Sequence, residues 1–155
     1  MSQGARFRYP LAPILLTRQW ELDARLLELG EHNAALARQQ GRAAHLQVQL
    51  AGAGADFQAL AGSGANLSVQ QFVLLSRYIG DLTLRLRAEE AEVARLAALR
   101  DALAERVVAS QRGVEAVEKH RDEMKSKFVQ HRLSGDFKIA DDQWNTLQTG
   151  TSNAI

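Results

Sequence analysis

The fold is decided by residues 69–133, which read VQQFVLLSRYIGDLTLRLRAEEAEVARLAALRDALAERVVASQRGVEAVEKHRDEMKSKFVQHRL. From Phe72 onward, apolar residues recur at alternating steps of three and four, an average of 3.5 residues per turn. That spacing keeps one face of a helix against a partner helix. The positions reached are Phe72, Leu75, Ile79, Leu82, Leu86, Glu89, Val93, Leu96, Arg100, Leu103, Val107, Ser110, Val114, Val117, Arg121, Met124, Phe128 and His131. The stretch therefore predicts one long helix that packs on another.

The partner helix is expected earlier in the chain, starting at Pro13. A proline suits the first helical position because its missing N–H has no partner there in any case. A seven-residue series of apolar residues follows: Leu15, Leu22, Leu29, Leu36, Ala43, Leu50 and Phe57. Its companion positions are Gln19, Leu26, Asn33 and Gln40, and then Leu46, Ala53 and Leu60. We expect Asn33 and Gln40, as polar residues within the seam, to help fix the register of the two helices.

Glycines and a helix-start signal mark the connection between the two helices. Gly52, Gly54, Gly62 and Gly64 each cost a helix about 1 kcal/mol relative to alanine. Ser68 and Gln71 then form a capping box, with Leu67 and Phe72 at the two positions of a hydrophobic staple. A short connection makes neighbouring long helices antiparallel.

The sequence thus predicts an all-α protein, an elongated antiparallel two-helix coiled-coil hairpin. The expected parts are an extended N-terminal segment 1–12, a helix 13–60, a turn 61–68, a helix 69–133 and a flexible C-terminal tail 134–155. Folding about residue 64 places Leu15 near Gly113, so that Val114–Leu133 outruns the first helix. The apolar stripe of this overhang is left either for a partner protein or for the N-terminal segment, folding back over it.

Composition argues against several classes of function. The net charge is +1 and there is no cysteine. Acidic residues interleave with the basic ones, which disfavours nucleic-acid binding. The four histidines lack the spacing that places two on one helical face for a metal, and the paired glycines precede no Lys-Ser/Thr of a phosphate loop. We expect a cytoplasmic protein that is not an enzyme, has no cofactor and no metal, and does not insert directly into a membrane.

Three motifs resemble the FliJ/YscO family of type III secretion and flagellar export proteins. The first is the opening FRYPLxxILxxRxxE of residues 7–21. The second is QQFxxxxxxI at residues 70–79, and the third is VEKxRxE at residues 117–123. Together they cover most of Phe7–Leu133, in the order found in the family. The resemblance implies an antiparallel two-helix hairpin similar to the central stalk of rotary ATPases.

The resemblance also implies partners. Its joined terminal end is expected to bind the hexameric secretion ATPase, through Leu15, Arg18, Val117, Arg121, Met124 and Phe128. The start of the second helix is expected to contact the cytoplasmic domain of the export gate protein, through Phe72 and Ile79. Family members are also linked to export chaperones. The implied role is a coupling component, peripheral at the inner-membrane export apparatus, in a flagellar or a virulence system. The alternatives are an export chaperone or escort protein, and a plain structural coiled-coil spacer.

Overall fold

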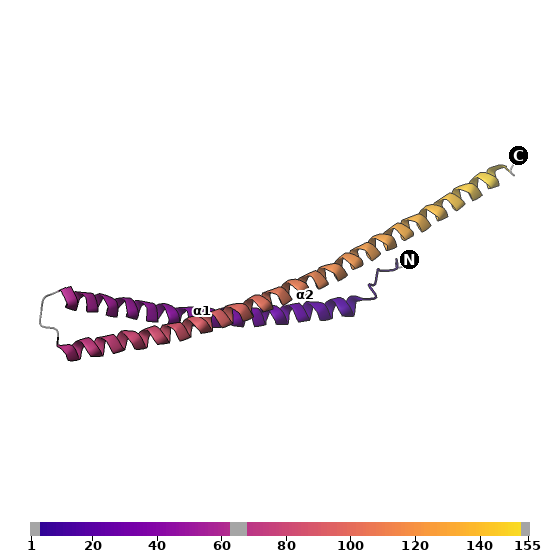
Figure 1. Ribbon diagram of the computed structural model, residues 1–155. Coiled ribbons are helices and arrows are strands. Elements are labelled where there is room, and N and C mark those ends of the chain that lie inside the picture. Colours follow the sequence, from indigo (N-terminus) through magenta and orange to yellow (C-terminus); the bar gives the residue numbers. More distant parts are fainter. Residues whose placement is uncertain (1–3, 63–67, 153–155) are drawn as a thin grey trace. The chain divides into compact units, whose positions relative to one another are not determined.

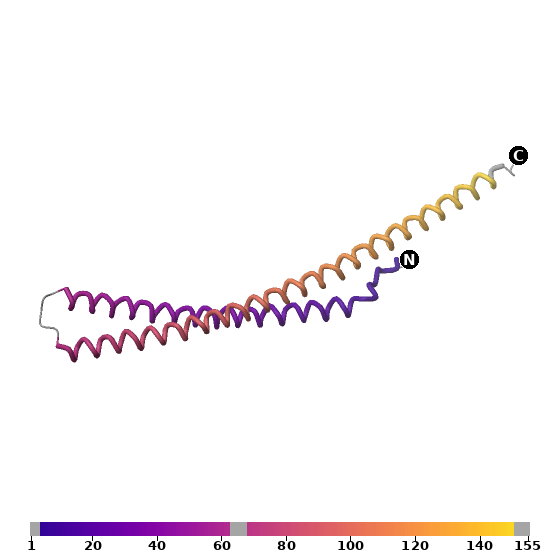
Figure 2. Tube along the Cα trace, viewed as in Figure 1, coloured from indigo at the N-terminus to yellow at the C-terminus, as the bar shows by residue number. Residues whose placement is uncertain are grey.

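The computed structural model describes residues 4–62 and 68–152, and all regular structure in those residues is helical. Helix α1 spans Ala12–Gly62 and helix α2 spans Val69–Ser152 (Figure 1). The two helices pack against each other as a helical hairpin, and the trace in Figure 2 follows both without a break. The predicted all-α, two-helix hairpin is therefore confirmed.

The contacts divide the chain into two units, which we describe separately. The central unit is Asp23–Val108, and the terminal unit combines Met1–Leu22 with Ala109–Ile155. In the central unit, the side chains that are most buried come from the two apolar series predicted from the sequence. They are Leu36, Ala43 and Ala53 of α1 and Leu82, Leu103 and Val107 of α2. Burying a leucine or valine side chain contributes about 1.5–3 kcal/mol, so this seam is the main source of stability.

The helices of the central unit are antiparallel, in the register that the sequence predicts. The rings of Phe57 and Phe72 lie 5.4 Å apart, centroid to centroid. Further from the turn, Gln39 of α1 meets Glu89 of α2. Both pairs lie nearly symmetrically about residue 64, so that moving back along α1 means moving forward along α2.

A buried amide does lie in the seam, but it is Gln39. Only 6% of its surface is exposed, and its Nε2 donates to the backbone carbonyl of Glu89 at 3.3 Å and to the Glu89 carboxylate. Asn33 and Gln40 are exposed, so their predicted place in the seam is wrong. The reason is that Leu46 and Ala53 fix the companion positions, and counting back from them in sevens reaches Gln39. The seven-residue repeat of companion positions therefore holds from Arg25 to Ala53, where each is buried or half-buried.

Replacing Gln39 with alanine should destabilise the hairpin. We expect Gln39→Ala to lower the free energy of unfolding by about 1–3 kcal/mol, because it leaves the half-buried Glu89 carboxylate without its donor. The matched control is Gln40→Ala, at an exposed position, with an expected change within about 0.5 kcal/mol. Urea unfolding followed by circular dichroism measures both. Equal effects of the two variants would contradict the assignment of Gln39 to the seam.

The helix ends differ in part from those predicted. At the start of α2, the Gln71 amide donates to Ser68 Oγ at 3.1 Å, as the capping box requires. The staple residue Leu67 and most of the predicted turn lie outside the described residues. Helix α1 begins one residue earlier and ends two residues later than predicted.

The largest difference is at the C-terminal end of α2. The helix does not stop at Leu133 but continues through Ser152, so the predicted flexible tail is helical over residues 134–152. Gly135, which is suited to a helix C-terminal cap, does not end the helix, since one glycine costs a helix only about 1 kcal/mol and no proline follows it. The hydroxyls of Thr146 and Thr149 donate to the carbonyls of Asp142 and Asn145, one turn back.

Candidate functional site

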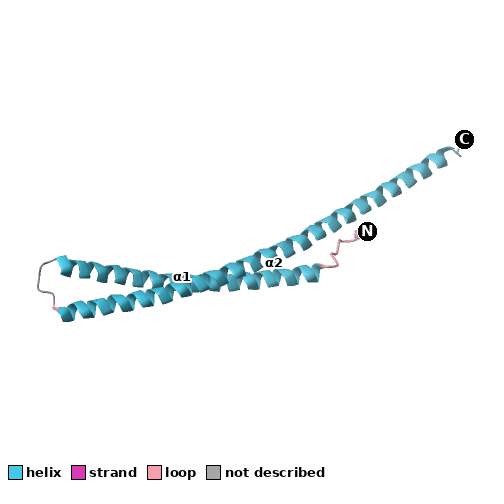
Figure 3. Ribbon diagram, in the orientation of Figure 1, coloured by secondary structure: helices cyan, strands magenta, loops and turns pink. Residues whose placement is uncertain are grey.

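In the terminal unit, residues 4–11 form a non-helical segment that lies on α2; we call it the N-terminal strap. Pro10 disfavours the helical conformation at Tyr9 before it, and α1 starts two residues after Pro10, at Ala12. The strap is the pink segment that leads into α1 in Figure 3. Its outermost described residue, Gly4, lies close to the guanidinium of Arg132. It therefore runs beside the part of α2 that was expected to outrun α1.

Two aromatic residues fasten the strap. Tyr9 is only 9% exposed, and its hydroxyl lies 2.7 Å from His120 Nδ1 and 3.4 Å from the backbone carbonyl of Val117. The ring of Phe7 lies 5.6 Å from that of Phe128 and tilted against it, a favourable geometry for an aromatic pair. Successive residues of an extended chain point to opposite sides, so residues 7 and 9 face the same way. That spacing was the signal in the sequence that could have revealed the strap.

The position of the strap shows whether the apolar stripe of Val114–Leu133 is left bare for a partner protein or covered by the N-terminal segment. The apolar stripe of α2 is not bare, because Val114 is buried and Val117, Arg121, Met124 and Phe128 are half-buried. The expectation of an uncovered stripe is wrong, and the alternative, that the N-terminal segment folds back over it, is correct. The physical reason is that Phe7 and Tyr9 supply apolar surface to the part of the stripe that lies beyond Ala12, the first residue of α1.

The remaining predicted contact residues divide between the two units. Leu15 is buried at 7% exposure, while Arg18 is exposed and crosses to α2 at Gly113. A Cβ at residue 113 would come within 2.9 Å of Arg18 Nη1, so the glycine gives the arginine its path. In the central unit, Phe72 is 45% exposed and Ile79 is half-buried.

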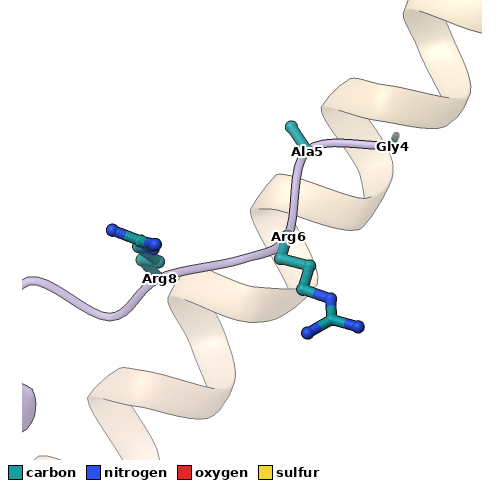
Figure 4. Close-up of a pocket in the computed structure, with 4 residues that line it drawn as sticks. All are labelled: Gly4, Ala5, Arg6 and Arg8. Atoms are coloured by element: carbon teal, nitrogen blue, oxygen red, sulfur yellow. The ribbon is translucent and has the colours of Figure 1, made fainter. Parts of the chain in front are cut away.

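The strap also carries two basic side chains. Figure 4 shows Arg6 and Arg8 with their guanidinium groups reaching away from each other, on either side of the strap. Together with Gly4 and Ala5 they line an open hollow. The neighbouring face of α2 carries both signs of charge, and Arg121 Nε pairs with its neighbour Asp122 at 3.2 Å. Among the described residues, neither Arg6 nor Arg8 forms an ion pair with an acid.

The strap should open when its aromatic anchors are removed. We expect Phe7→Ala with Tyr9→Ala to accelerate tryptic cleavage after Arg6 and Arg8 by about tenfold or more. Loss of about 1.4 kcal/mol of local stability already raises the open population tenfold, and two aromatic side chains contribute at least that much. Mass spectrometry of timed digests measures the rates.

The control for the strap is Leu11→Ala, which truncates an apolar residue of the same segment that is 38% exposed. We expect its cleavage rate to stay within about threefold of the parent chain. Fast cleavage of the parent chain itself would contradict the anchoring roles of Phe7 and Tyr9.

Histidine and carboxylate side chains, which often act in catalysis or bind metals, make local contacts in the described residues of this chain. His32 Nδ1 lies 2.9 Å from the carbonyl of Glu28, one turn away. Arg95 lowers the pKa of the Glu92 carboxyl, mainly by hydrogen bonds from Nε at 2.9 Å and from Nη2 at 2.6 Å. Within the described residues there is no group of three or more potential metal ligands. Over the same residues, neither helix has a stretch apolar enough, at the length required, to cross a membrane.

Comparison of this chain with protein-family models, with curated proteins and with solved structures finds no match.

Proposed function

We propose that the protein is a non-catalytic coupling component of a bacterial type III secretion or flagellar export apparatus. In this proposal it is cytoplasmic, peripheral at the inner membrane, and joins the export ATPase ring to the export gate. The observation that carries the proposal is the ordered set of FliJ/YscO-like motifs, FRYPLxxILxxRxxE, QQFxxxxxxI and VEKxRxE. The two-helix hairpin supports it, because that is the fold which the resemblance implies.

The strap changes which side chains a ring of ATPase subunits could meet. Leu15, Val117, Met124 and Phe128 lie in or near the seam, so in this proposal they hold the terminal end together. The contact itself falls to exposed residues of the same end. Arg18 is the exposed member of the predicted set, and a guanidinium suits the bidentate recognition of a carboxylate on a partner.

Reversing the charge of Arg18 tests the ATPase contact. We expect the parent chain to stimulate turnover by the purified hexameric export ATPase, and Arg18→Glu to need at least about fivefold more protein for the same stimulation. The control is Arg38→Glu, the same change at an exposed position of α1 in the central unit. Circular dichroism should show equal helix content for both variants.

The outcomes separate the functions. Normal stimulation by Arg18→Glu would remove this residue from the contact and leave the coupling role in place. Absence of stimulation by the parent chain would overturn that role. If the protein instead forms stoichiometric complexes with export clients and has no effect on ATPase turnover, the result would establish the alternative function of an export chaperone.

Substitutions in the ring pair of Phe57 and Phe72 test the predicted contact with the gate. Phe72→Ala and Phe57→Ala remove the same aromatic pair, but Phe72 alone is predicted to touch the gate. We expect Phe72→Ala to weaken binding to the cytoplasmic domain of the gate by about tenfold, as loss of an aromatic anchor does. Phe57→Ala should change it by about threefold at most, and calorimetry measures both. Equal weakening would mean that the ring pair only supports the helix ends.

A further inference from the structure

A second apolar stripe runs along the last part of α2, beyond the N-terminal strap. Starting at Leu133, it repeats at steps of four, three, four and three. Its members are Leu133, Phe137, Ala140, Trp144 and Leu147. The four large side chains are between 51% and 71% exposed. This is the spacing of a coiled-coil seam, on a stretch whose described side chains are otherwise exposed as well.

This stripe is not a continuation of the intramolecular seam. Continued from Phe128 in steps of three and four, that seam passes through His131 and Gly135, and Gly135 is the one half-buried residue in this part of the helix. Leu133 and Phe137 lie roughly half a turn away from that line. The exposed stripe therefore faces away from the side of α2 that the strap covers.

Acidic residues flank the stripe on both sides. Asp136 directly precedes Phe137, and Asp141 directly follows Ala140, which are the two flanking positions of a heptad seam. The other flanking positions within residues 134–150 are uncharged: Ser134, Gln143, Gln148 and Gly150. Lys138 and Asp142 lie on the far side of the helix. No described residue forms an ion pair with Asp136 or Asp141.

We propose that this face docks an amphipathic helix of a partner protein whose apolar stripe is flanked by basic residues. The small Ala140 between Phe137 and Trp144 leaves a hole for a large apolar side chain of the partner, in the manner of knobs-into-holes packing. Charge complementarity selects the basic partner, since coiled-coil partner choice is set by the flanking charges. The proposal does not rest on the export function.

Charge also argues against two other occupants. In a second copy of this chain, the aspartates of one stripe would face those of the other, in either orientation of the helices. An anionic membrane surface attracts helices with Lys and Arg beside the apolar face, whereas here those positions carry aspartate. A single helix of this length is marginally stable in water, so a docked partner would also stabilise residues 133–152 as a helix.

The test uses Trp144 as its reporter. The chain has two tryptophans, so Trp20→Phe in the full-length protein leaves Trp144 alone. The probe is a synthetic peptide of three heptads, with leucine at both seam positions and lysine at both flanking positions. Its mate carries glutamate in place of lysine. We expect saturable binding of the lysine peptide with a blue shift of Trp144 emission, at least about tenfold tighter than the glutamate peptide.

Two charge reversals distinguish the effect of a charge beside the stripe from the effect of the net charge on peptide binding. Asp141→Lys and Asp142→Lys change the net charge equally, but only residue 141 flanks the stripe. We expect Asp141→Lys to reduce the preference for the lysine peptide about tenfold and Asp142→Lys to leave it within about threefold. Phe137→Ser should abolish the emission shift with both peptides.

Four results would overturn the proposal. They are equal affinity for the two peptides, absence of binding to either peptide, self-association in sedimentation equilibrium that Phe137→Ser removes, and a Trp144 blue shift on anionic vesicles that Phe137→Ser removes. The third would assign the stripe to a second copy, and the fourth to a lipid surface.

Discussion

The structure depends on one interaction, the interlocking of two heptad stripes along α1 and α2. Within the described part of the central unit, the buried side chains all lie in this seam, and a helix with a single exposed stripe gains little stability by itself. Leu36, Leu82 and Leu103 are among the seam's most buried side chains, together with the small Ala43 and Ala53. Within this seam, Gln39 and Glu89 favour this register of the helices, because their hydrogen bonds form only where the two residues meet. A slipped register would strand their polar groups against apolar side chains.

Much of the buried seam could be predicted from the sequence because its apolar residues recur at a regular spacing. Seven-residue spacing predicts which face of α2 is buried, and of the eighteen stripe positions only Phe72 and His131 are exposed. The start of α2 was predictable for a different reason: Ser68 has a direct chemical role there, accepting a hydrogen bond from a specific backbone amide. Local signals of these two kinds need no knowledge of the rest of the chain.

The errors came where two local signals competed or where a contact joined distant residues. Gln40 and Gln39 are neighbouring glutamines, and only the continuity of the heptad through Leu46 and Ala53 separates them. Gly135 resembles a helix stop, although its cost is small beside the propensity of its neighbours. The spacing of Phe7 and Tyr9 indicates that two aromatic rings share one side of the strap, but it does not identify their partners. The contact of Tyr9 with His120, 111 residues along the chain, follows only from tertiary packing. The strap also lies on the end of the hairpin expected to contact the ATPase, and Arg18 is the one exposed residue of that expected set.

The strap has a mechanical consequence. Long paired helices can convey a signal by slipping one helix along the other, and a slip of one heptad would displace α1 by about 10 Å. In the terminal unit such a slip would tear Phe7 from Phe128 and Tyr9 from His120, because Pro10 and Pro13 leave little slack between the strap and α1. The strap thus acts as a latch against sliding.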